Sequence, residues 1–176
     1  MNCRIFVCGP PRHGKDTFAR YLAEAMGLPW GGPGSAVGST SDAIYARMAE
    51  LRGVSEGELR ALPKEDLRPD LVALGDEMVK DDLAALVKAL PDRVRIVTGV
   101  RRAAEFEAVP HPKVLVWMAR EGGPRIVDNT ERALEEMADV SLVFREGDFH
   151  GMKSCAAALV EEFEKYEQQL ENTPGG

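Results

Sequence analysis

The sequence predicts an α/β protein with a mostly parallel β-sheet. Short apolar runs of strand length alternate along the chain with longer segments in which apolar residues recur at helical spacing. A glycine-bounded loop also joins the first predicted strand directly to the first predicted helix. The 176 residues are 44% hydrophobic, which suits one domain with a full apolar core. We therefore expect a single domain that spans residues 1–176.

The first predicted unit is a strand, a loop and a helix. The strand covers residues 5–8, and the helix carries apolar side chains at helical spacing between Phe18 and Met26. This order is typical of a phosphate-binding loop, in which backbone N–H groups and a helix N-terminus point at one small, positive volume. The candidate phosphate-binding residues are therefore Gly9, Pro10, Arg12, His13, Gly14, Lys15, Asp16 and Thr17.

The residues of this loop have separate expected roles. Two glycines, Gly9 and Gly14, let the backbone turn tightly and approach phosphate oxygens. Lys15 brings an ammonium group to the β- and γ-phosphates. His13 is expected to be exposed and to take no part in catalysis.

The position after the lysine departs from the usual motif. A serine or threonine is expected there, because its hydroxyl binds Mg²⁺, but the sequence has Asp16 followed by Thr17. The Asp16 carboxylate can reach the metal through water or accept a proton from the nucleophile. We expect ATP and Mg²⁺ as cofactors, with Asp16 and Thr17 on the metal side.

A loop and a helical segment are predicted next. Residues 29–38 are rich in glycine and proline and indicate a loop, with at most a short edge strand at residues 28–30. Residues 39–42 resemble an N-cap cluster at the start of a helix, although their hydroxyl groups can also contact an acceptor. A further helix is expected to begin near Pro69. We expect the helical segment of about residues 39–90 to cover the acceptor.

The second half of the chain supplies the remaining strands. Strands are predicted at residues 94–100, 114–118 and 140–144, with a short helix at 130–137 and a long helix from Met152. In parallel sheets, ligands bind beyond the carboxyl ends of the strands. The phosphate-binding loop, residues 99–102 and Arg120 all follow strands, so we expect them at one edge.

Phosphoryl transfer needs cations around the transferred group. Arg101 directly follows a strand and is the best-placed catalytic cation, the alternative being a salt bridge with Glu105. Arg102 is a candidate acceptor-side residue, unless it is simply solvated. Arg120 is a candidate ATP-binding residue that begins a short lid at residues 120–129, which also contains Arg125; a plain surface loop is the alternative.

The acceptor side has two further candidates. Arg68 can hold an acceptor phosphate, and Asp76 can orient an acceptor hydroxyl or serve as its base. The alternative for both residues is ion pairing on a helix surface.

Charge, cysteines and hydropathy exclude several classes of protein. The net charge of −7 argues against a broad nucleic-acid-binding face, but not against local recognition by clustered basic residues. The three cysteines lack metal-ligand spacing and are expected to be free thiols. No run approaches membrane-spanning length and the chain begins with a core strand, so we expect a cytoplasmic protein without membrane contact.

Several stretches resemble the phage-type deoxynucleoside monophosphate kinases and related P-loop kinases. They are Gly14-Lys15-Asp16-Thr17, the segment from Arg68-Pro69 to Asp82, Arg95-Ile96-Val97-Thr98-Gly99-Val100-Arg101 followed by Glu105, and Ala138-Asp139-Val140. The resemblance implies a three-layer P-loop NTPase fold with a five-stranded sheet ordered 2-3-1-4-5, ATP with Mg²⁺, and a deoxynucleotide acceptor. Gly9, Gly14, Lys15, Asp16 and Thr17 match the phosphate-binding loop of the family, and Arg101 matches the arginine that ends the third strand.

One departure from the family pattern points to a second group of kinases. The family commonly has an aspartate where this sequence has Gly99, which leaves Asp16 as the metal-side carboxylate. The sequence is also similar to kinases of phages with hypermodified DNA, which phosphorylate the hydroxymethyl group of 5-hydroxymethyluracil within DNA. A hydroxyl acceptor needs a base, which Asp16 or Asp76 can supply.

The expected function is therefore transfer of the ATP γ-phosphate to a deoxynucleotide-type acceptor. A free nucleoside monophosphate is the first candidate, and 5-hydroxymethyluracil in DNA is the second. A regulatory NTPase without an acceptor pocket is a more distant alternative. The expected partners are this acceptor and, if the protein forms a homodimer, a second copy of the chain. If a phage encodes the protein, we expect it in the cytoplasm of the host cell.

Overall fold

The sheet has the predicted order and is parallel throughout. The computed structural model describes residues 3–123 and 129–172. Within them, five strands form one sheet in the order β2-β3-β1-β4-β5, and each neighbouring pair is parallel. The strands are β1 (Arg4–Cys8), β2 (Val37–Ser39), β3 (Ile96–Thr98), β4 (Lys113–Arg120) and β5 (Val140–Phe144). The predicted fold class and strand order are confirmed.

The apolar runs in the sequence form the centre of this sheet. On β1, Phe6 pairs with Val97 of β3 and Leu115 of β4, and all three side chains are fully buried. A strand buried on both faces needs continuous apolar sequence rather than alternation, which is what residues 5–8 provide.

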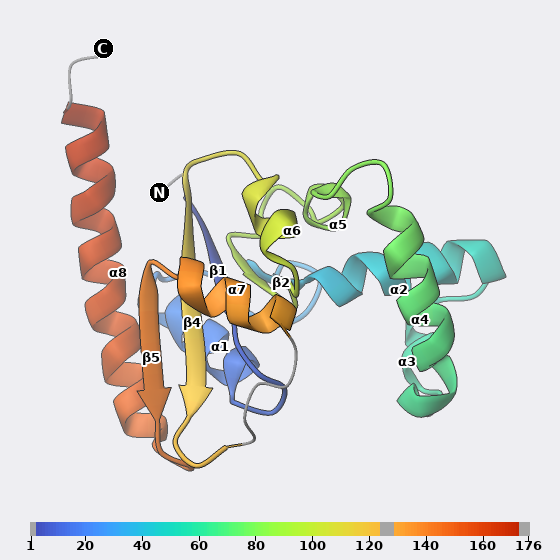
Figure 1. Cartoon of the computed structure of the whole chain (residues 1–176), viewed down its shortest axis with the longest axis horizontal. Coiled ribbons are helices and arrows are strands. Elements are labelled where there is room, and N and C mark those ends of the chain that lie inside the picture. The colour runs from blue at the N-terminus through green and yellow to red at the C-terminus, as the bar shows by residue number, and fades with distance from the viewer. Residues whose placement is uncertain (1–2, 124–128, 173–176) are drawn as a thin grey trace.

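Helices cover both faces of the sheet (Figure 1). One face packs on α1 and α8, and the other on the segment around α5 and on α6 and α7. The eight helices of the described residues are α1 (Lys15–Ala25), α2 (Thr40–Arg52), α3 (Glu56–Arg60), α4 (Lys64–Met78), α5 (Ala85–Lys88), α6 (Ala103–Glu107), α7 (Asn129–Met137) and α8 (Phe149–Asn172).

The expected helical segment extends away from the sheet. Figure 1 shows α2, α3 and α4 packed together beside the rest of the molecule. They share a small apolar cluster made of Tyr45, Met48, Ala49, Leu59 and Leu67. This cluster holds the three helices to one another, while Ala43 of α2 joins the main core.

The second strand lies in a different place from the prediction. The sequence indicated at most a short strand at residues 28–30, but β2 is Val37–Ser39, inside the glycine- and proline-rich stretch. Gly38 suits this position, because a Cβ atom there would lie 3.0 Å from a methyl carbon of Val94 and would need that side chain to shift. A three-residue strand with a central glycine shows no apolar alternation, so composition alone suggested a loop.

The start of α4 also differs from the prediction. The helix begins at Lys64 rather than near Pro69, and Pro63 is its N-cap. Pro69 therefore lies inside the helix, where it has no N–H to donate to a carbonyl one turn earlier. The cost of this missing bond is lower at a solvent-exposed face, and Pro69 is exposed.

The thiols match the sequence analysis. The cysteines Cys3, Cys8 and Cys155 are free, and the first two are buried. Burial raises the pKa of the Cys8 thiol to about 12, so it stays protonated at neutral pH. None of the helices in the described ranges is both long and apolar enough to cross a bilayer.

Candidate active site

The phosphate-binding loop lies at the carboxyl edge of the sheet, between β1 and α1. Gly9 has φ of 136°, and a Cβ atom there would lie only 1.9 Å from the carbonyl oxygen of Met118 on β4. Gly14 has φ of 86° and is the N-cap of α1. Both positions favour glycine because their φ angles are positive, and Gly9 also has no room for a side chain beside Met118. A helix N-terminus of this kind can bind an anion through the N–H groups of its first turn.

Lys15 spans this loop. Its Nζ donates a hydrogen bond of 2.7 Å to the carbonyl oxygen of Pro10. Arg12 is exposed and has φ of 63°, so the loop is left-handed at a non-glycine residue. Asp16 is exposed and Thr17 is half-buried in the first turn of α1. The structure thus gathers the loop residues that the sequence analysis selected around one helix N-terminus.

The prediction for His13 is wrong with respect to its exposure. The residue is only 4% exposed, and its Nδ1 accepts a hydrogen bond of 2.9 Å from the backbone N–H of Arg120. Burial and the nearby Arg120 and Lys15 charges lower the pKa of the imidazole below its usual value of 6.5. A histidine in a short polar loop carries no sequence signal of burial, because its contact comes from β4, far along the chain.

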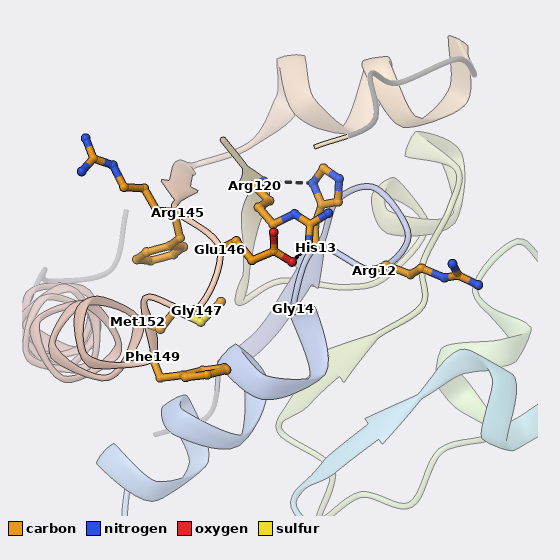
Figure 2. A pocket seen from close by; sticks show the side chains of 10 residues that line it. Arg12, His13, Gly14, Arg120, Arg145, Glu146, Gly147, Phe149 and Met152 are labelled. Atoms are coloured by element: carbon orange, nitrogen blue, oxygen red, sulfur yellow. Dashed lines mark hydrogen bonds and ion pairs between the residues drawn. The ribbon is translucent and has the colours of Figure 1, made fainter. Parts of the chain in front are cut away.

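A cavity of about 190 Å³ adjoins the phosphate-binding loop. Figure 2 shows its walls, which come from the loop, the end of β4 and the connection between β5 and α8. At the rim, Arg120 forms an ion pair of 2.8 Å with Glu146. The lining residues are Arg12, His13, Gly14, Arg120, Phe144, Arg145, Glu146, Gly147, Phe149 and Met152.

The sequence analysis missed the wall that follows β5. Phe144, Glu146 and Met152 line the cavity but were not selected as site residues. A signal was available, because β5 also ends at the carboxyl edge and the residues after it belong to the same ligand-binding side.

The connection between β3 and α6 carries two arginines with different surroundings. Arg101 is exposed, and its backbone N–H donates to Glu105 Oε2 at 3.3 Å. The Arg102 guanidinium lies 2.6 Å from Asp76 Oδ1 and 3.8 Å from Glu105 Oε1. Glu105 is buried, with 7% of its surface exposed. The Glu105 carboxylate therefore pairs with the side chain of Arg102 and accepts a hydrogen bond from the main chain of Arg101.

Two of the three acceptor-side candidates pair with each other. Asp76 of α4 is paired with Arg102, which joins the helical segment to the β3–α6 connection. This hydrogen bond raises the pKa of the Arg102 guanidinium. Arg68 lies on the exposed side of α4, about two turns before Asp76.

Comparison with known proteins identifies the family. No family model matches the chain. Cytidylate kinase of Aeropyrum pernix is 33% identical over 129 residues, which cover 62% of this chain and 67% of that protein. The chain belongs to the small P-loop kinases. Shikimate kinase of Chlamydia muridarum is 35% identical over 83 residues, which cover 44% of this chain and 45% of that protein.

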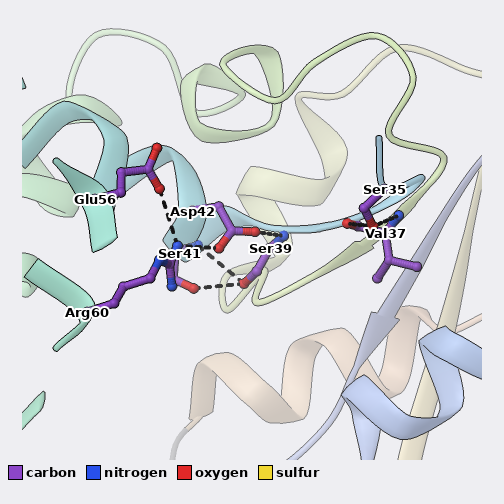
Figure 3. A network of polar contacts seen from close by, with 7 residues as sticks. All are labelled: Ser35, Val37, Ser39, Ser41, Asp42, Glu56 and Arg60. Atoms are coloured by element: carbon purple, nitrogen blue, oxygen red, sulfur yellow. Dashed lines mark hydrogen bonds and ion pairs between the residues drawn. The ribbon is translucent and has the colours of Figure 1, made fainter. Parts of the chain in front are cut away.

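In this P-loop kinase, the hydroxyl-rich segment at residues 39–42 caps α2, as predicted. Ser39 is the N-cap, and its N–H donates to Asp42 Oδ2 at 2.8 Å in a reciprocal capping box. Asp42 also pairs with Arg60 at 2.7 Å, and Ser41 Oγ lies 2.9 Å from Ser39 Oγ (Figure 3). Capping and ion pairing thus account for Ser39 and Asp42.

The hydroxyl groups also explain the glycine at the end of β3 in this kinase. Gly99 has φ of 88°, and a Cβ atom there would lie 2.7 Å from both Ser39 Oγ and Thr40 Oγ1. An aspartate at this position would meet both hydroxyl oxygens and would have to adopt an unfavourable positive φ.

The expected lid is only partly within the described residues. Arg120 and the turn up to Gly123 belong to them, but residues 124–128, which include Arg125, lie outside. Gly123 N donates to Arg120 O at 3.0 Å, which closes the turn.

Proposed function

We propose that this P-loop kinase transfers the γ-phosphate of ATP to a deoxynucleotide-type acceptor, with a nucleoside monophosphate as the first candidate. The observation that carries the proposal is the loop from Gly9 to Lys15, whose backbone is shaped by Gly9 and Gly14 around the N-terminus of α1. The name of the cytidylate kinase relative supports a nucleotide acceptor. We regard the whole chain as one kinase domain.

The triphosphate and the nucleoside of ATP have adjacent places in this proposal. The phosphates bind at the loop N–H groups, where Lys15 Nζ exchanges the Pro10 carbonyl for phosphate oxygens. The nucleoside enters the neighbouring cavity, which offers apolar surface from Phe144, Phe149 and Met152 beside the Arg120 guanidinium. An apolar pocket with a few polar groups suits a base and a ribose.

The residues present fit Mg²⁺. This ion prefers oxygen ligands and commonly takes one or two from protein and the rest from phosphate and water. Asp16 and Thr17 supply a carboxylate and a hydroxyl at the first turn of α1, next to the proposed phosphate site. Bound there, the ion would neutralise charge on the phosphate oxygens.

The chemical step follows from this placement. The acceptor oxygen attacks the γ-phosphorus, the bond from this phosphorus to the β,γ-bridging oxygen breaks, and ADP leaves with that oxygen. Arg101 and Lys15 stabilise the charge on the transferred group. When the acceptor is a hydroxyl, Asp16 or Asp76 takes its proton.

The acceptor binds between the helical segment and the β3–α6 connection in this proposal. Arg68 and Arg102 are the candidate contacts to an acceptor phosphate, and Asp76 orients the acceptor. Because Arg102 and Asp76 are half-exposed and already paired, an incoming anion can exchange with the carboxylate at low cost.

The second candidate acceptor is 5-hydroxymethyluracil in DNA. The observation in its favour is the glycine at position 99 beneath the hydroxyl groups of Ser39 and Thr40, where the phage-type family commonly has a carboxylate. The loss of a carboxylate at this edge of the site is consistent with an acceptor other than a free monophosphate. The net charge of −7 would restrict DNA contact to the cations at this edge.

The test is transfer of labelled phosphate from ATP to a panel of acceptors. The panel contains the deoxynucleoside monophosphates, the corresponding nucleosides, and DNA with or without 5-hydroxymethyluracil. Transfer to one or more monophosphates supports the first candidate. Transfer to modified DNA alone replaces it with the second, and ATP hydrolysis without any transfer contradicts the kinase proposal.

A further inference from the structure

His13 connects two parts of the candidate site that are 107 positions apart in the sequence. It belongs to the phosphate-binding loop, directly before Gly14, while its hydrogen-bond donor is the main chain of Arg120 at the end of β4. Figure 2 shows the imidazole ring beside Arg120 at the head of the cavity. The contact therefore joins the triphosphate side of the cavity to its nucleoside side.

The hydrogen bond at Nδ1 defines the tautomer of the neutral His13 ring. Because Nδ1 accepts from a backbone N–H, the ring proton of the neutral imidazole is on Nε2. Nε2 is buried and has no hydrogen-bond partner within the described part of the chain. An unpaired buried donor is destabilising. The hydrogen bond at Nδ1 is therefore the polar contact that the described residues provide to this buried ring.

The ring also supports the turn that follows β4. At Gly123, a Cβ atom would lie 2.6 Å from His13 Nε2, so the backbone of the turn rests against the ring edge. The same turn is closed by the bond from Gly123 N to Arg120 O. His13 therefore holds the turn at Nδ1 by a hydrogen bond and at Nε2 by close packing.

The side chain of Arg120 links this turn to the opposite wall of the cavity. Its guanidinium pairs with Glu146 in the β5–α8 connection, on the opposite wall. A shift of the Arg120 main chain relative to the loop would move this ion pair and change the width of the cavity.

We propose that His13 is a positioning residue that fixes the Arg120 turn to the phosphate-binding loop, so that the triphosphate and nucleoside sites keep one geometry. The ring contacts no reacting atom in this role. The inference rests on the proposed function for its effect on ATP, but the contact itself can be tested without ATP.

The test compares two nearly isosteric replacements, His13→Asn and His13→Leu. The asparagine Oδ1 lies close to the position of the histidine Nδ1 and can accept the Arg120 N–H, whereas leucine cannot. By calorimetric titration with MgATP, we expect the leucine variant to bind about tenfold more weakly and the asparagine variant to stay within about threefold of the parent protein. The KM for the acceptor at saturating ATP should change little in either variant.

A second measurement follows the contact itself. Amide hydrogen exchange of Arg120 should be slow in the parent protein and in His13→Asn, and faster in His13→Leu, with or without ATP. His111→Leu is the matched control, because His111 is exposed and precedes β4 at the opposite edge of the sheet. Thermal melts of all the variants establish that they are folded.

The outcomes separate the two proposals. Equal ATP affinity in the asparagine and leucine variants, or equal exchange of the Arg120 amide, would overturn the role of His13. A parent protein that shows a protected Arg120 amide but no affinity for ATP would instead overturn the proposed function and leave His13 as a structural link between the loop and the turn.

Discussion

At the scale of single residues, the site depends on a few side chains with distinct surroundings. Lys15 donates a hydrogen bond across the loop to the Pro10 carbonyl, Arg101 is exposed in the β3–α6 connection, and His13 is buried. The sequence motif identified the first two by chemical type and position after a strand. It did not identify the environment of His13, because that environment comes from Arg120, far along the chain.

Replacement of Arg101 tests its proposed role in the transition state. We expect Arg101→Ala to lower kcat by roughly 10²–10³-fold with little effect on the KM for ATP, because the guanidinium acts on charge that develops during transfer. Steady-state kinetics measure this change. Arg93→Ala, at an exposed arginine before β3, is the control and should be unaffected. Near-normal turnover of Arg101→Ala would remove this residue from the mechanism.

The lowered pKa of His13 predicts a pH dependence of stability. The folded protein favours the neutral ring more than the unfolded chain does, whose histidine pKa is near 6.5. This contribution is fully present above pH 6.5 and is lost as the pH falls through the lower folded-state pKa. Denaturant unfolding at several pH values should therefore show less pH dependence below 6.5 for His13→Leu than for the parent protein. Identical slopes would contradict this assignment.

At the scale of the elements, the end of α6 is held by a cation from the strand that follows it. α6 runs back along the sheet, so its C-terminal carbonyl groups face the start of β4. Lys113 Nζ donates to the carbonyl oxygens of Phe106, Glu107 and Val109 at 2.6, 2.9 and 2.7 Å. A cation at this end also interacts favourably with the helix dipole.

Replacement of Lys113 tests this cap. We expect Lys113→Met to reduce the free energy of unfolding by about 1–3 kcal/mol, because the stem of the side chain is kept but three carbonyl groups lose their donor. Urea denaturation measures the change. Lys165→Met is the comparison, since that lysine is exposed on α8 and pairs only with a neighbouring glutamate in the described contacts. A loss as large for Lys165→Met would mean that the carbonyl contacts contribute nothing specific.

The sequence predicted the elements with strong apolar patterns and misplaced those without them. β1, β3 and β4 are buried and were found from their continuous apolar runs. β2 is held instead by its neighbour β3, with Arg95 N and Ile96 N both donating to Ala36 O. A strand defined by its partner, and a helix that continues through Pro69, cannot be read from local composition.

At the scale of the whole molecule, the parallel order of the sheet gathers the site. The phosphate-binding loop, the β3–α6 connection and the end of β4 meet at one edge because all of the strands run the same way. The sequence pattern was sufficient to predict this common edge. It could not predict the cavity, whose far wall comes from the connection between β5 and α8 (Figure 2).

Ligand binding should stabilise the fold, because ATP would bind the folded chain, which brings residues 12–14, 120 and 144–152 together, and not the unfolded one. At an ATP concentration 100-fold above Kd, the gain is about 2.7 kcal/mol. For a chain of this size, that gain raises Tm by about 5–10 °C. Thermal unfolding with and without MgATP measures the shift.

The control for this shift uses two lysines. Lys15→Ala should abolish the increase in Tm, whereas Lys153→Ala, at an exposed lysine of α8, should keep it. No increase in the parent protein would contradict ATP binding, and an increase that survives Lys15→Ala would place the nucleotide elsewhere.

The crowding around Gly99 determines which residues this kinase can carry directly after β3. Two hydroxyl oxygens occupy the space that any larger residue would enter, and the local backbone angle disfavours one as well. An acidic side chain at position 99 would therefore require the Ser39 and Thr40 hydroxyl groups to move away, and it would still be strained by the positive φ.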